Sequence, residues 1–523
     1  MTRWAAAAGA AVLAVAVSAC TPAATPTVRH DILPNEVSGV DIPAGRVDAA
    51  VAKLDGLARE LMDSTGIPGL AVAVVHGGKT VYAKGFGVRD TRAGDGPDNA
   101  VNPDTVFQLA SMSKPVGATV VAQQISAGNI SWDTPVVSQL PWFALSDPYV
   151  TDHVTIADLY AHRSGLPDHA GDRLEDLGYD RREVLQRLRY LPLAPFRNHY
   201  DYTNFGLTAA AEAIPAAAGV PWEQLSADVL YRPLGMTSTS SRYADFLARP
   251  NRALTHVKTD DGYQPRYQRN PDAQSPAGGV SSSVNDMARW LAMVLAGGSY
   301  EGNAIIAPEA LLPAITPQMI SAPAATGTAR AGFYGEGFNV SITSSGRTQY
   351  SHSGAFLLGA ATAFSALPSQ DVGIVVLTNA TPVGVPESLA AQFLDLVQYG
   401  EIREDWPALY RQVLEPMSQP EGALVGAPPP AHPAPARPLS AYVGEYANPY
   451  WGPATVAEDH GALVVTLGPQ HRRFRLSHYD GDTFTFALQG ENAPEGTVSK
   501  ATFTTDAVEL EYFDHDKLGR FTR

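Results

Sequence analysis

Residues 107–115 read Phe-Gln-Leu-Ala-Ser-Met-Ser-Lys-Pro, and this stretch is the strongest indication of the fold and chemistry of the chain. An apolar run ends at Ser111, which opens a predicted helix, and Lys114 follows three residues later on the same helical face. A serine hydroxyl is a poor nucleophile at neutral pH, but an adjacent amine that burial keeps uncharged can activate it. The free backbone N–H groups at a helix N-terminus also suit the oxyanion of an acyl-transfer step. The spacing therefore suggests a nucleophile and its base.

The same pair also has a purely structural interpretation, in which Ser111 caps a helix and Lys114 is solvated. The flanking residues argue against this structural interpretation, because Val106, Leu109 and Val116 place the lysine beside an apolar core rather than on a solvent-exposed face. A lysine in such surroundings favours the chemical interpretation.

The composition limits the kinds of partner that the chain can have. It has 523 residues and a formal net charge of −16, and it shows no basic stripe, which disfavours nucleic acid as a partner. Its 13 histidines form no His-x-His-x-Asp-His or His-Glu-x-x-His run. A metallohydrolase is therefore disfavoured, and we expect neither a metal nor a cofactor.

Residues 1–19 are predicted to be an export signal rather than part of the fold, because their apolar run is too short to span a membrane as a helix. Small residues precede Cys20, the only cysteine, as in a bacterial lipobox. We therefore expect acylation of Cys20, attachment to the outer face of the cell membrane, and a polar tether over residues 20–44. The alternative is an ordinary secretory signal with Cys20 incidental and the protein secreted.

Residues 45–400 are predicted to form one mixed α/β domain. Strand patterns at 69–75 and 80–83 open this segment, and strand patterns at 359–366 and 372–378 close it. Helical patterns lie between them, so the two ends of the segment are expected to share one sheet.

Two further segments follow this domain. Residues 401–437 are rich in Pro and Ala, which predicts a semi-rigid extended linker. Residues 438–523 contain about eight short alternating runs separated by Gly, Asp and Asn, which predict a small all-β barrel. Whether this barrel is a lid, a ligand cup or a packing partner stays open.

Two later motifs carry side chains suited to the same chemistry. Tyr202 and Asn204 stand two apart in a loop, where a tyrosine can relay a proton and an asparagine can hold a substrate amide. His352 and Gly354 begin a strand, and the glycine allows a ligand to approach the backbone closely. Taken singly, a Tyr-x-Asn tripeptide is more often a turn with a packed tyrosine. A His-x-Gly tripeptide is more often a structural histidine near a turn, with its hydrogen bonds satisfied.

Together, Ser-x-x-Lys at 111–114, Tyr-x-Asn at 202–204 and His-x-Gly at 352–354 resemble the class C β-lactamase and D-alanyl-D-alanine carboxypeptidase family. The run Asp-Leu-Tyr-Ala-His-Arg-Ser-Gly-Leu-Pro at 158–167 is also similar to that family, and the β domain resembles a lipocalin-like C-terminal module. The resemblance implies an α+β fold of the β-lactamase/transpeptidase type, in which a helical cluster packs on a five-stranded antiparallel sheet.

The resemblance also implies a role for each candidate residue. Ser111 would be the nucleophile, Lys114 its base and Tyr202 the proton shuttle. The backbone N–H groups of Ser111 and Ala355 would form the oxyanion hole. The substrate-binding residues would be Asn204, His352, Ser353, Gly354 and Ala355.

The histidine at position 352 departs from the Lys-Thr-Gly pattern of class A β-lactamases. An unperturbed histidine, with a pKa near 6.5, is mostly neutral at pH 7 and holds a substrate carboxylate less strongly than lysine does. We therefore expect an exported serine hydrolase that cleaves an amide or ester of a small molecule or a peptidoglycan peptide. A D-alanyl-D-alanine carboxypeptidase-like peptidase or an esterase, with weak β-lactamase activity, fits best. The alternative is a lipoprotein that binds penicillin or peptidoglycan without turnover.

Overall fold

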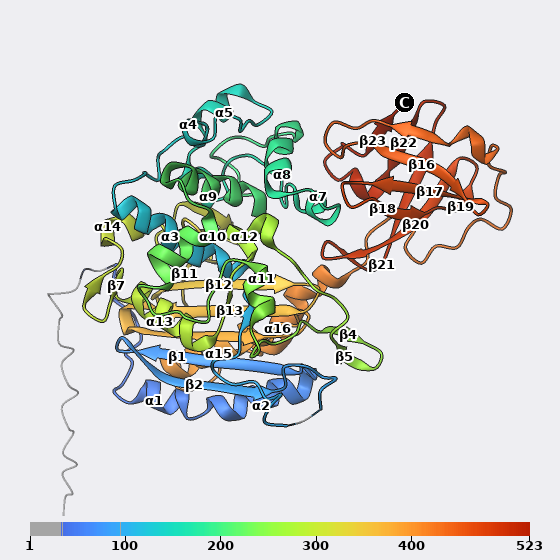
Figure 1. Cartoon of the computed structure of the whole chain (residues 1–523). Coiled ribbons are helices and arrows are strands. Elements are labelled where there is room, and N and C mark those ends of the chain that lie inside the picture. Colours follow the sequence, from blue (N-terminus) through green and yellow to red (C-terminus); the bar gives the residue numbers. More distant parts are fainter. Residues whose placement is uncertain (1–32, 34, 95) are drawn as a thin grey trace, which may run out of the picture.

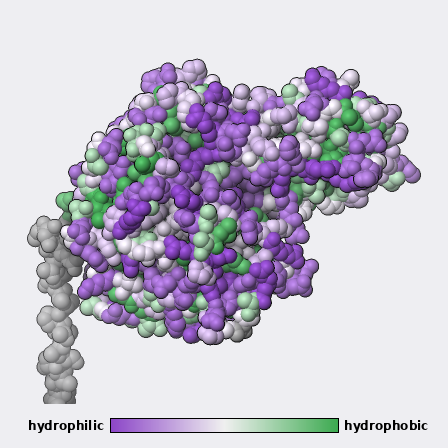
Figure 2. Space-filling model, viewed as in Figure 1, coloured by the Kyte–Doolittle hydropathy of each residue, from purple (hydrophilic) through white to green (hydrophobic). Residues whose placement is uncertain are grey.

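The computed structural model describes residues 33, 35–94 and 96–523. The predicted export signal, Cys20 and the first part of the tether lie outside the described residues. None of the described helices is long and apolar enough to cross a membrane. The face of the molecule in Figure 2 is mostly hydrophilic, with hydrophobic residues in small separate patches.

An eight-stranded antiparallel sheet organises the larger part of the chain (Figure 1). Its strands are, in spatial order, β2 (Lys79–Gly87), β1 (Gly69–His76), β14 (Val372–Thr378), β13 (Ala360–Leu367), β12 (Thr348–Phe356), β11 (Asn339–Ile342), β10 (Gly332–Tyr334) and β9 (Met319–Ala322). The early and late strands meet where β1 pairs with β14, with Leu70 opposite Thr378. The short strands β9 to β11 extend the sheet beyond the five strands that the resemblance implies.

Helices cover both faces of this sheet because its central strands are apolar on both faces. Successive β1 side chains point to opposite faces, and both sets are buried. One set belongs to the core shared with α1 (Arg46–Val51), α2 (Leu54–Thr65) and α15 (Val385–Tyr399). The other set belongs to the core shared with α13 (Val284–Leu295) and the helical cluster.

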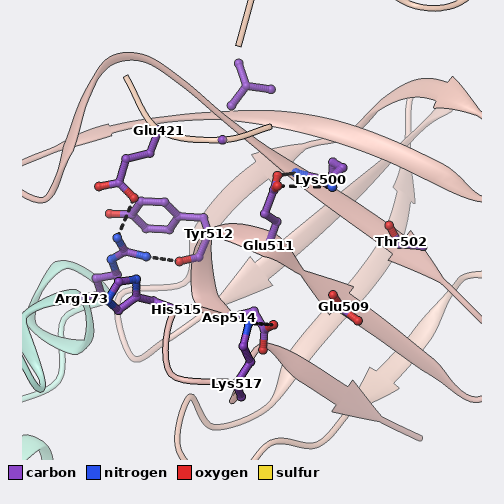
Figure 3. Close-up of a pocket in the computed structure, with 12 residues that line it drawn as sticks. Arg173, Glu421, Lys500, Thr502, Glu509, Glu511, Tyr512, Asp514, His515 and Lys517 are labelled. Carbon is purple, nitrogen blue, oxygen red and sulfur yellow. Dashed lines mark hydrogen bonds and ion pairs between the residues drawn. The ribbon is translucent and has the colours of Figure 1, made fainter. Parts of the chain in front are cut away.

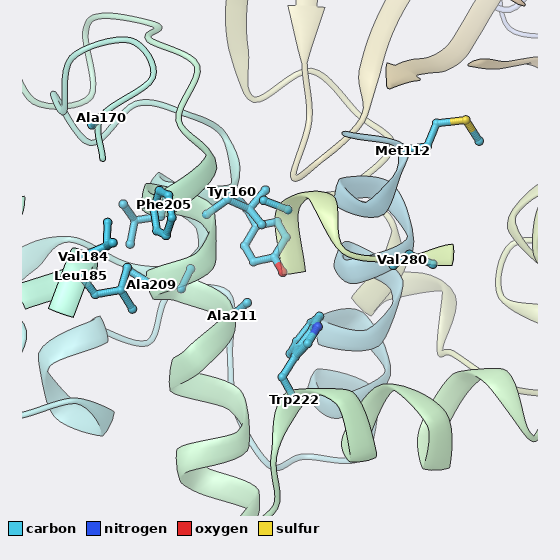
Figure 4. Packing of buried hydrophobic residues seen from close by; sticks show 14 of the residues in the cluster. Met112, Tyr160, Ala170, Val184, Leu185, Phe205, Ala209, Ala211, Trp222 and Val280 are labelled. Atoms are coloured by element: carbon cyan, nitrogen blue, oxygen red, sulfur yellow. The ribbon is translucent and has the colours of Figure 1, made fainter. Parts of the chain in front are cut away.

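The helical cluster is built around α3 (Ser113–Ser126), whose residues 113–122 are all buried. Figure 4 shows apolar side chains such as Tyr160, Phe205 and Trp222 gathered between these helices. The other helices are α4 (Val136–Gln139), α5 (Pro148–His153), α6 (Ile156–Tyr160), α7 (Asp172–Asp176), α8 (Arg181–Arg187), α9 (Asn204–Ala218), α10 (Trp222–Ser226), α11 (Tyr243–Ala248), α12 (Ser275–Gly278) and α14 (Pro308–Leu311). Three two-stranded ribbons join them: β3 (Phe107–Gln108) with β6 (Ser281–Ser282), β4 (Val257–Thr259) with β5 (Gly262–Gln264), and β7 (Ser299–Tyr300) with β8 (Asn303–Ala304).

The C-terminal region is all-β, as predicted, but its described strand pairs form two sheets rather than one closed barrel. The first sheet contains β15 (Gly444–Tyr446), β16 (Ala454–Asp459), β17 (Ala462–Leu467) and β18 (Arg472–Arg475). The second contains β19 (Ser477–Asp480), β20 (Thr483–Gly490), β21 (Ala493–Phe503), β22 (Ala507–Leu510) and β23 (Arg520–Thr522). An isolated bridge between Ala447 and Thr522 links the two sheets at one edge. Alternating patterns predict strands, but they do not determine how the strands close.

Residues 401–437 are not extended throughout, because α16 (Trp406–Leu414) and a 3₁₀ turn (Glu415–Ser418) lie within them. Asp405 caps α16 by accepting a hydrogen bond from the backbone N–H of Ala408 at 3.1 Å. Pro407 stands in the first helical turn, where a missing N–H costs nothing. The sequence did not predict this capped helix, because the Pro-rich composition of residues 401–437 favours an extended linker.

Candidate active site

Ser111 lies in a tight turn rather than at the start of an α-helix, which corrects the expectation from the sequence. Ala110–Met112 form a 3₁₀ turn, and α3 begins at Ser113. The physical reason is Ala110, whose φ of 48° lies in the left-handed region that interrupts a helix. A non-glycine residue held in this region stores backbone strain, a feature that clusters at functional sites.

Lys114 is buried, and its amine lies within hydrogen-bond distance of three oxygens. Its Nζ atom lies 3.0 Å from Oγ of Ser111, 2.6 Å from Oδ1 of Asn204 and 3.2 Å from the carbonyl oxygen of Ala277. Burial lowers the pKa of Lys114 to about 7, and the negative charge of Asp172 opposes this shift. A large fraction of the amine is therefore uncharged near neutral pH and able to accept the proton of the Ser111 hydroxyl.

Tyr202 lies against the same amine, with its ring centroid 4.4 Å from Lys114 Nζ. Burial raises the pKa of Tyr202 well above its usual value, and a hydrogen bond with the Ser111 hydroxyl opposes this shift. The phenol therefore stays protonated beside the nucleophile. It is placed to donate a proton rather than to act as the first base.

His352 lies on β12 and is neutral near pH 7. Its Nδ1 lies 2.6 Å from the carbonyl oxygen of Ser353, so Nδ1 is the donor and Nε2 accepts from the Tyr334 hydroxyl at 2.8 Å. Burial, together with the positive charge of Lys114, lowers the pKa of His352 to about 3. The neutral imidazole that the sequence predicted is therefore enforced by burial. Ser353 and Ala355 line the same cavity as Ser111, so the three sequence motifs meet at one place.

Gly354 is required because β12 packs directly against the turn that holds Ser111. A Cβ atom at Gly354 would collide with the carbonyl oxygen of Leu109 and would lie 3.0 Å from the backbone nitrogen of Met112. The sequence predicted a close backbone approach at this glycine. The group that approaches Gly354 is the 3₁₀ turn that holds Ser111, however, and not a ligand.

Two residues that the sequence analysis did not select join the same hydrogen-bond chain. Oδ2 of Asp172 accepts a hydrogen bond from Nδ2 of Asn204 at 2.8 Å and lies 2.8 Å from Nδ1 of His169. These contacts hold the Asn204 amide with its oxygen toward Lys114. The His-x-Gly tripeptide at His169 was visible in the sequence, but nothing in its spacing points to Asn204.

A cavity of about 570 Å³ contains Ser111, and both folded parts of the chain form its walls. The C-terminal region contributes Tyr450, Trp451, Glu491, Asn492, Pro494, His515 and Asp516, and the segment after α16 contributes Pro416, Met417, Gln419 and Glu421. Nδ2 of Asn492 donates to Oδ2 of Asp176 at 3.0 Å, across the boundary between the two parts. The β region is therefore part of the site wall.

Arg173 connects the helical cluster to the β region, and Figure 3 shows its contacts with Glu421 and Tyr512. Its guanidinium donates to the Glu421 carboxylate at 2.7 Å and to the carbonyl oxygen of Tyr512. Its Cζ atom also lies 4.0 Å from the centroid of the Tyr512 ring. One arginine thus joins the helical cluster, the segment after α16 and the C-terminal sheets.

An antiparallel sheet flanked by helices, with a Ser-x-x-Lys turn at their junction, defines a serine β-lactamase-type hydrolase. The family model described as Beta-lactamase matches residues 54–399, so the chain belongs to the beta-lactamase family. A model described as a domain of unknown function (DUF3471) matches residues 428–511. The family and the fold class predicted from the sequence are confirmed, whereas the lipocalin-like description of the β region stays a prediction.

Relatives of known name agree with this assignment. An unguisins hydrolase of Aspergillus campestris is 27% identical over 76% of this chain and 75% of its own. The D-alanyl-D-alanine-carboxypeptidase/endopeptidase AmpH of Escherichia coli (strain K12) is 27% identical over 47% of this chain and 63% of its own. The solved structure of an octameric penicillin-binding protein homologue from Pyrococcus abyssi has a TM-score of 0.59 and 20% identity, covering 90% of this chain and 100% of that chain. At this identity the structural likeness shows a shared fold.

Proposed function

We propose that the protein is a serine hydrolase that cleaves an amide or an ester through an acyl-Ser111 intermediate. One observation carries the proposal: the buried amine of Lys114, with its pKa lowered to about 7, lies 3.0 Å from Oγ of Ser111. A general base in this position typically accelerates a reaction by about 10²–10⁴-fold.

In the first step, Lys114 takes the proton of the Ser111 hydroxyl while Oγ forms a bond to the substrate carbonyl carbon. The carbonyl electron pair moves to its oxygen, which the backbone N–H groups of Ser111 and Ala355 would hold. Collapse of this intermediate breaks the bond to the leaving group, which receives the proton through Tyr202. Water then attacks the acyl group by the reverse route and restores the Ser111 hydroxyl.

We propose that the substrate is a peptide or an ester, as for a D-alanyl-D-alanine carboxypeptidase-like peptidase or an esterase, and that β-lactams are hydrolysed only weakly. Burial lowers the pKa of His352 to about 3, so this residue supplies no positive charge for the carboxylate of a β-lactam. The similarity to AmpH, a carboxypeptidase and endopeptidase by name, supports the peptide class.

The test combines covalent labelling with a substrate panel. A fluorescent fluorophosphonate should label the wild-type protein at Ser111 and should leave the Ser111→Ala variant unlabelled. Turnover is then measured with a D-Ala-D-Ala peptide, a nitrophenyl ester and a chromogenic cephalosporin. We expect the ester or the peptide to be hydrolysed at least about tenfold faster than the cephalosporin. Labelling of the Ser111→Ala variant at wild-type level, or turnover that survives this substitution, would contradict the assignment of the nucleophile.

We further propose that the chain is exported and anchored through lipid on Cys20. The apolar run before Cys20 and the small residues next to it support this location. Cells expressing the full chain are grown with a clickable fatty acid. We expect the wild-type protein to be labelled and the Cys20→Ala variant to be unlabelled and released from the membrane fraction. Equal labelling of both proteins would exclude the anchor.

A further inference from the structure

Glu387 is a buried carboxyl group in the wall of the cavity that contains Ser111. It lies in the first turn of α15, directly after Pro386, and only 9% of its surface is exposed. Its Oε2 atom has no hydrogen-bond partner among the described residues. Burying an unpaired carboxylate is unfavourable, so proteins usually pair such a group or place a ligand against it.

Three other carboxylates of this wall, Glu491, Asp172 and Glu421, have partners within the protein. Glu491 accepts hydrogen bonds from the backbone N–H groups of Leu357 at 2.9 Å and Leu358 at 3.2 Å. Asp172 accepts from Asn204, and Glu421 pairs with Arg173 at 2.7 Å. Oδ1 of Asp172 also lacks a partner among the described residues, but its Oδ2 already contacts Asn204 and His169. Asp168 and Asp516 are less buried than Glu387. Glu387 is therefore the buried acid of this wall that is best placed to be neutralised from outside the chain.

The arginines of the cavity, in contrast, are already neutralised by protein carboxylates. Arg269 pairs with Glu175 at 2.5 Å, and Arg173 pairs with Glu421. Both arginines line the cavity. A substrate carboxylate would have to break one of these ion pairs, of which Arg269–Glu175 is buried, whereas a substrate cation would meet Glu387 without displacing anything.

We propose that Glu387 forms a subsite for a positively charged group of the substrate, so that the enzyme prefers amides or esters that carry a free ammonium group over those that carry a carboxylate. This inference rests on the proposed function, since it concerns the cavity that contains Ser111. Among the substrates of the proposed function, it favours peptides with a free amino group and esters of amino acids or amino alcohols over a D-Ala-D-Ala peptide whose only charge is its C-terminal carboxylate.

The electrostatics of Glu387 agree with this subsite. Burial raises the pKa of Glu387 to about 7, and interactions with its own backbone N–H and with the Ser353 hydroxyl oppose the shift. An ammonium group placed beside the carboxyl would favour its ionised form, and the resulting charge-assisted hydrogen bond is stronger than one to a neutral group. Ser353 lies on β12, next to His352, so the subsite adjoins the strand along which substrate is expected to lie.

The first experiment compares three nitrophenyl esters of the same length that end in an ammonium group, an acetamido group or a carboxylate. For the wild-type protein, we expect kcat/KM for the ammonium ester to exceed that for the acetamido ester by about tenfold and that for the carboxylate ester by more. In Glu387→Gln, the ratio of ammonium to acetamido kcat/KM should fall to about one. Glu309→Gln is the matched control, because Glu309 also follows a proline in the first turn of a helix, α14, but is exposed to solvent.

The second experiment measures binding without turnover. Calorimetry with the Ser111→Ala variant compares its affinity for the ammonium ester with its affinity for the acetamido ester. The same two esters are then measured with the double variant Ser111→Ala/Glu387→Gln. We expect a preference for the ammonium compound of about tenfold that disappears in the double variant. Equal affinities in Ser111→Ala, or a preference that survives Glu387→Gln, would overturn the subsite.

The two proposals fail in different ways. If wild-type turnover persists in Ser111→Ala, the proposed nucleophile is wrong, and the subsite inference falls with it. If turnover depends on Ser111 but the ester ratio is the same in the wild type, Glu387→Gln and Glu309→Gln, only the subsite is refuted.

Discussion

Among single residues, Lys114 sets how the activity should depend on pH. The amine must be uncharged to accept the Ser111 proton, and burial lowers its pKa to about 7. We therefore predict that kcat/KM for a nitrophenyl ester rises with pH through about 7 and is constant above it. Arginine cannot lose its proton in this range, so Lys114→Arg should reduce kcat/KM by about 10²–10⁴-fold. A Lys114→Arg variant that keeps wild-type activity at every pH would refute the assignment of the base.

Asp172 is predicted to act through Asn204 and Lys114 rather than on the substrate. Its negative charge favours the protonated lysine, so Asp172→Asn should move the acid limb of the kcat/KM profile to lower pH. It should also lower kcat by about tenfold, because the charged acceptor that orients the Asn204 amide is replaced by a neutral amide, which accepts a weaker hydrogen bond. Asp168→Asn serves as the control, since Asp168 lies at the same cavity but is 57% exposed. An acid limb that stays in place, in a folded Asp172→Asn variant, would show a merely structural role.

Lys114 could be predicted from the sequence, whereas Asp172 could not. Ser111 and Lys114 were found because their chemistry needs a fixed spacing on one turn. Asp172 was missed because its partner, Asn204, is distant in the chain and only the folded structure brings the two side chains within 2.8 Å. The neutral state of His352 was predicted from its ordinary pKa, whereas in the structure burial is the cause.

At the scale of elements, the position of Ser111 depends on the packing of β12 against the 3₁₀ turn. We predict that Gly354→Ala destabilises the fold by about 1–3 kcal/mol, because the added methyl group meets the backbone of Leu109 and Met112 as well as the buried hydroxyl of Thr362. Activity should fall further than stability, since the displaced turn carries the nucleophile. Thermal unfolding and ester hydrolysis measure the two effects.

Gly56→Ala provides the control for this substitution. Gly56 lies within α2, and a Cβ atom there meets nothing within 4 Å. Alanine is a better helix former than glycine, so this change should raise the stability by about 0.5–1 kcal/mol. If Gly354→Ala behaves like Gly56→Ala in both assays, the strand does not hold the turn in place.

The elements that were predicted well are those with a strong period or a uniform apolar run. The strands at 69–75 and 372–378 were found in this way, and they pair as β1 and β14. The helix expected at Ser111 begins two residues later, because the positive φ of Ala110 is a tertiary effect without a local signature. α16 was missed because the prolines around it dominate the local composition.

In the whole molecule, the C-terminal region helps to enclose the cavity that contains Ser111. Figure 1 shows its two sheets beyond the helical cluster, connected to the larger part by the segment that contains α16. The contacts across the boundary include scattered polar pairs, such as Tyr179 with the carbonyl oxygen of Trp451 at 2.8 Å, and apolar residues of both parts that belong to one core cluster. These contacts join residues distant in the chain and follow no periodicity, so the sequence left the role of this region open between lid, cup and packing partner.

Asn492 offers a direct test of whether this wall limits the size of the substrate. Its side-chain amide donates to Oδ2 of Asp176 at 3.0 Å and to the carbonyl oxygen of Asp172 at 3.2 Å. Asn492→Ala removes both bonds and should loosen the wall, because the buried Asp176 carboxylate loses a partner. We predict that the ratio of kcat/KM for a bulky acyl ester to that for an acetyl ester rises by about three- to tenfold.

The control for this change is Asp459→Asn, which alters a β16 residue that pairs with Arg473 and does not line the cavity. Its ester ratio should equal that of the wild type. If Asn492→Ala also leaves the ratio unchanged while its unfolding temperature falls, the β region contributes stability alone. A rise in the ratio that is absent from Asp459→Asn would mean that substrate size is set at the contact between the two parts of the chain. Residues far outside the three catalytic motifs would then share in choosing the substrate.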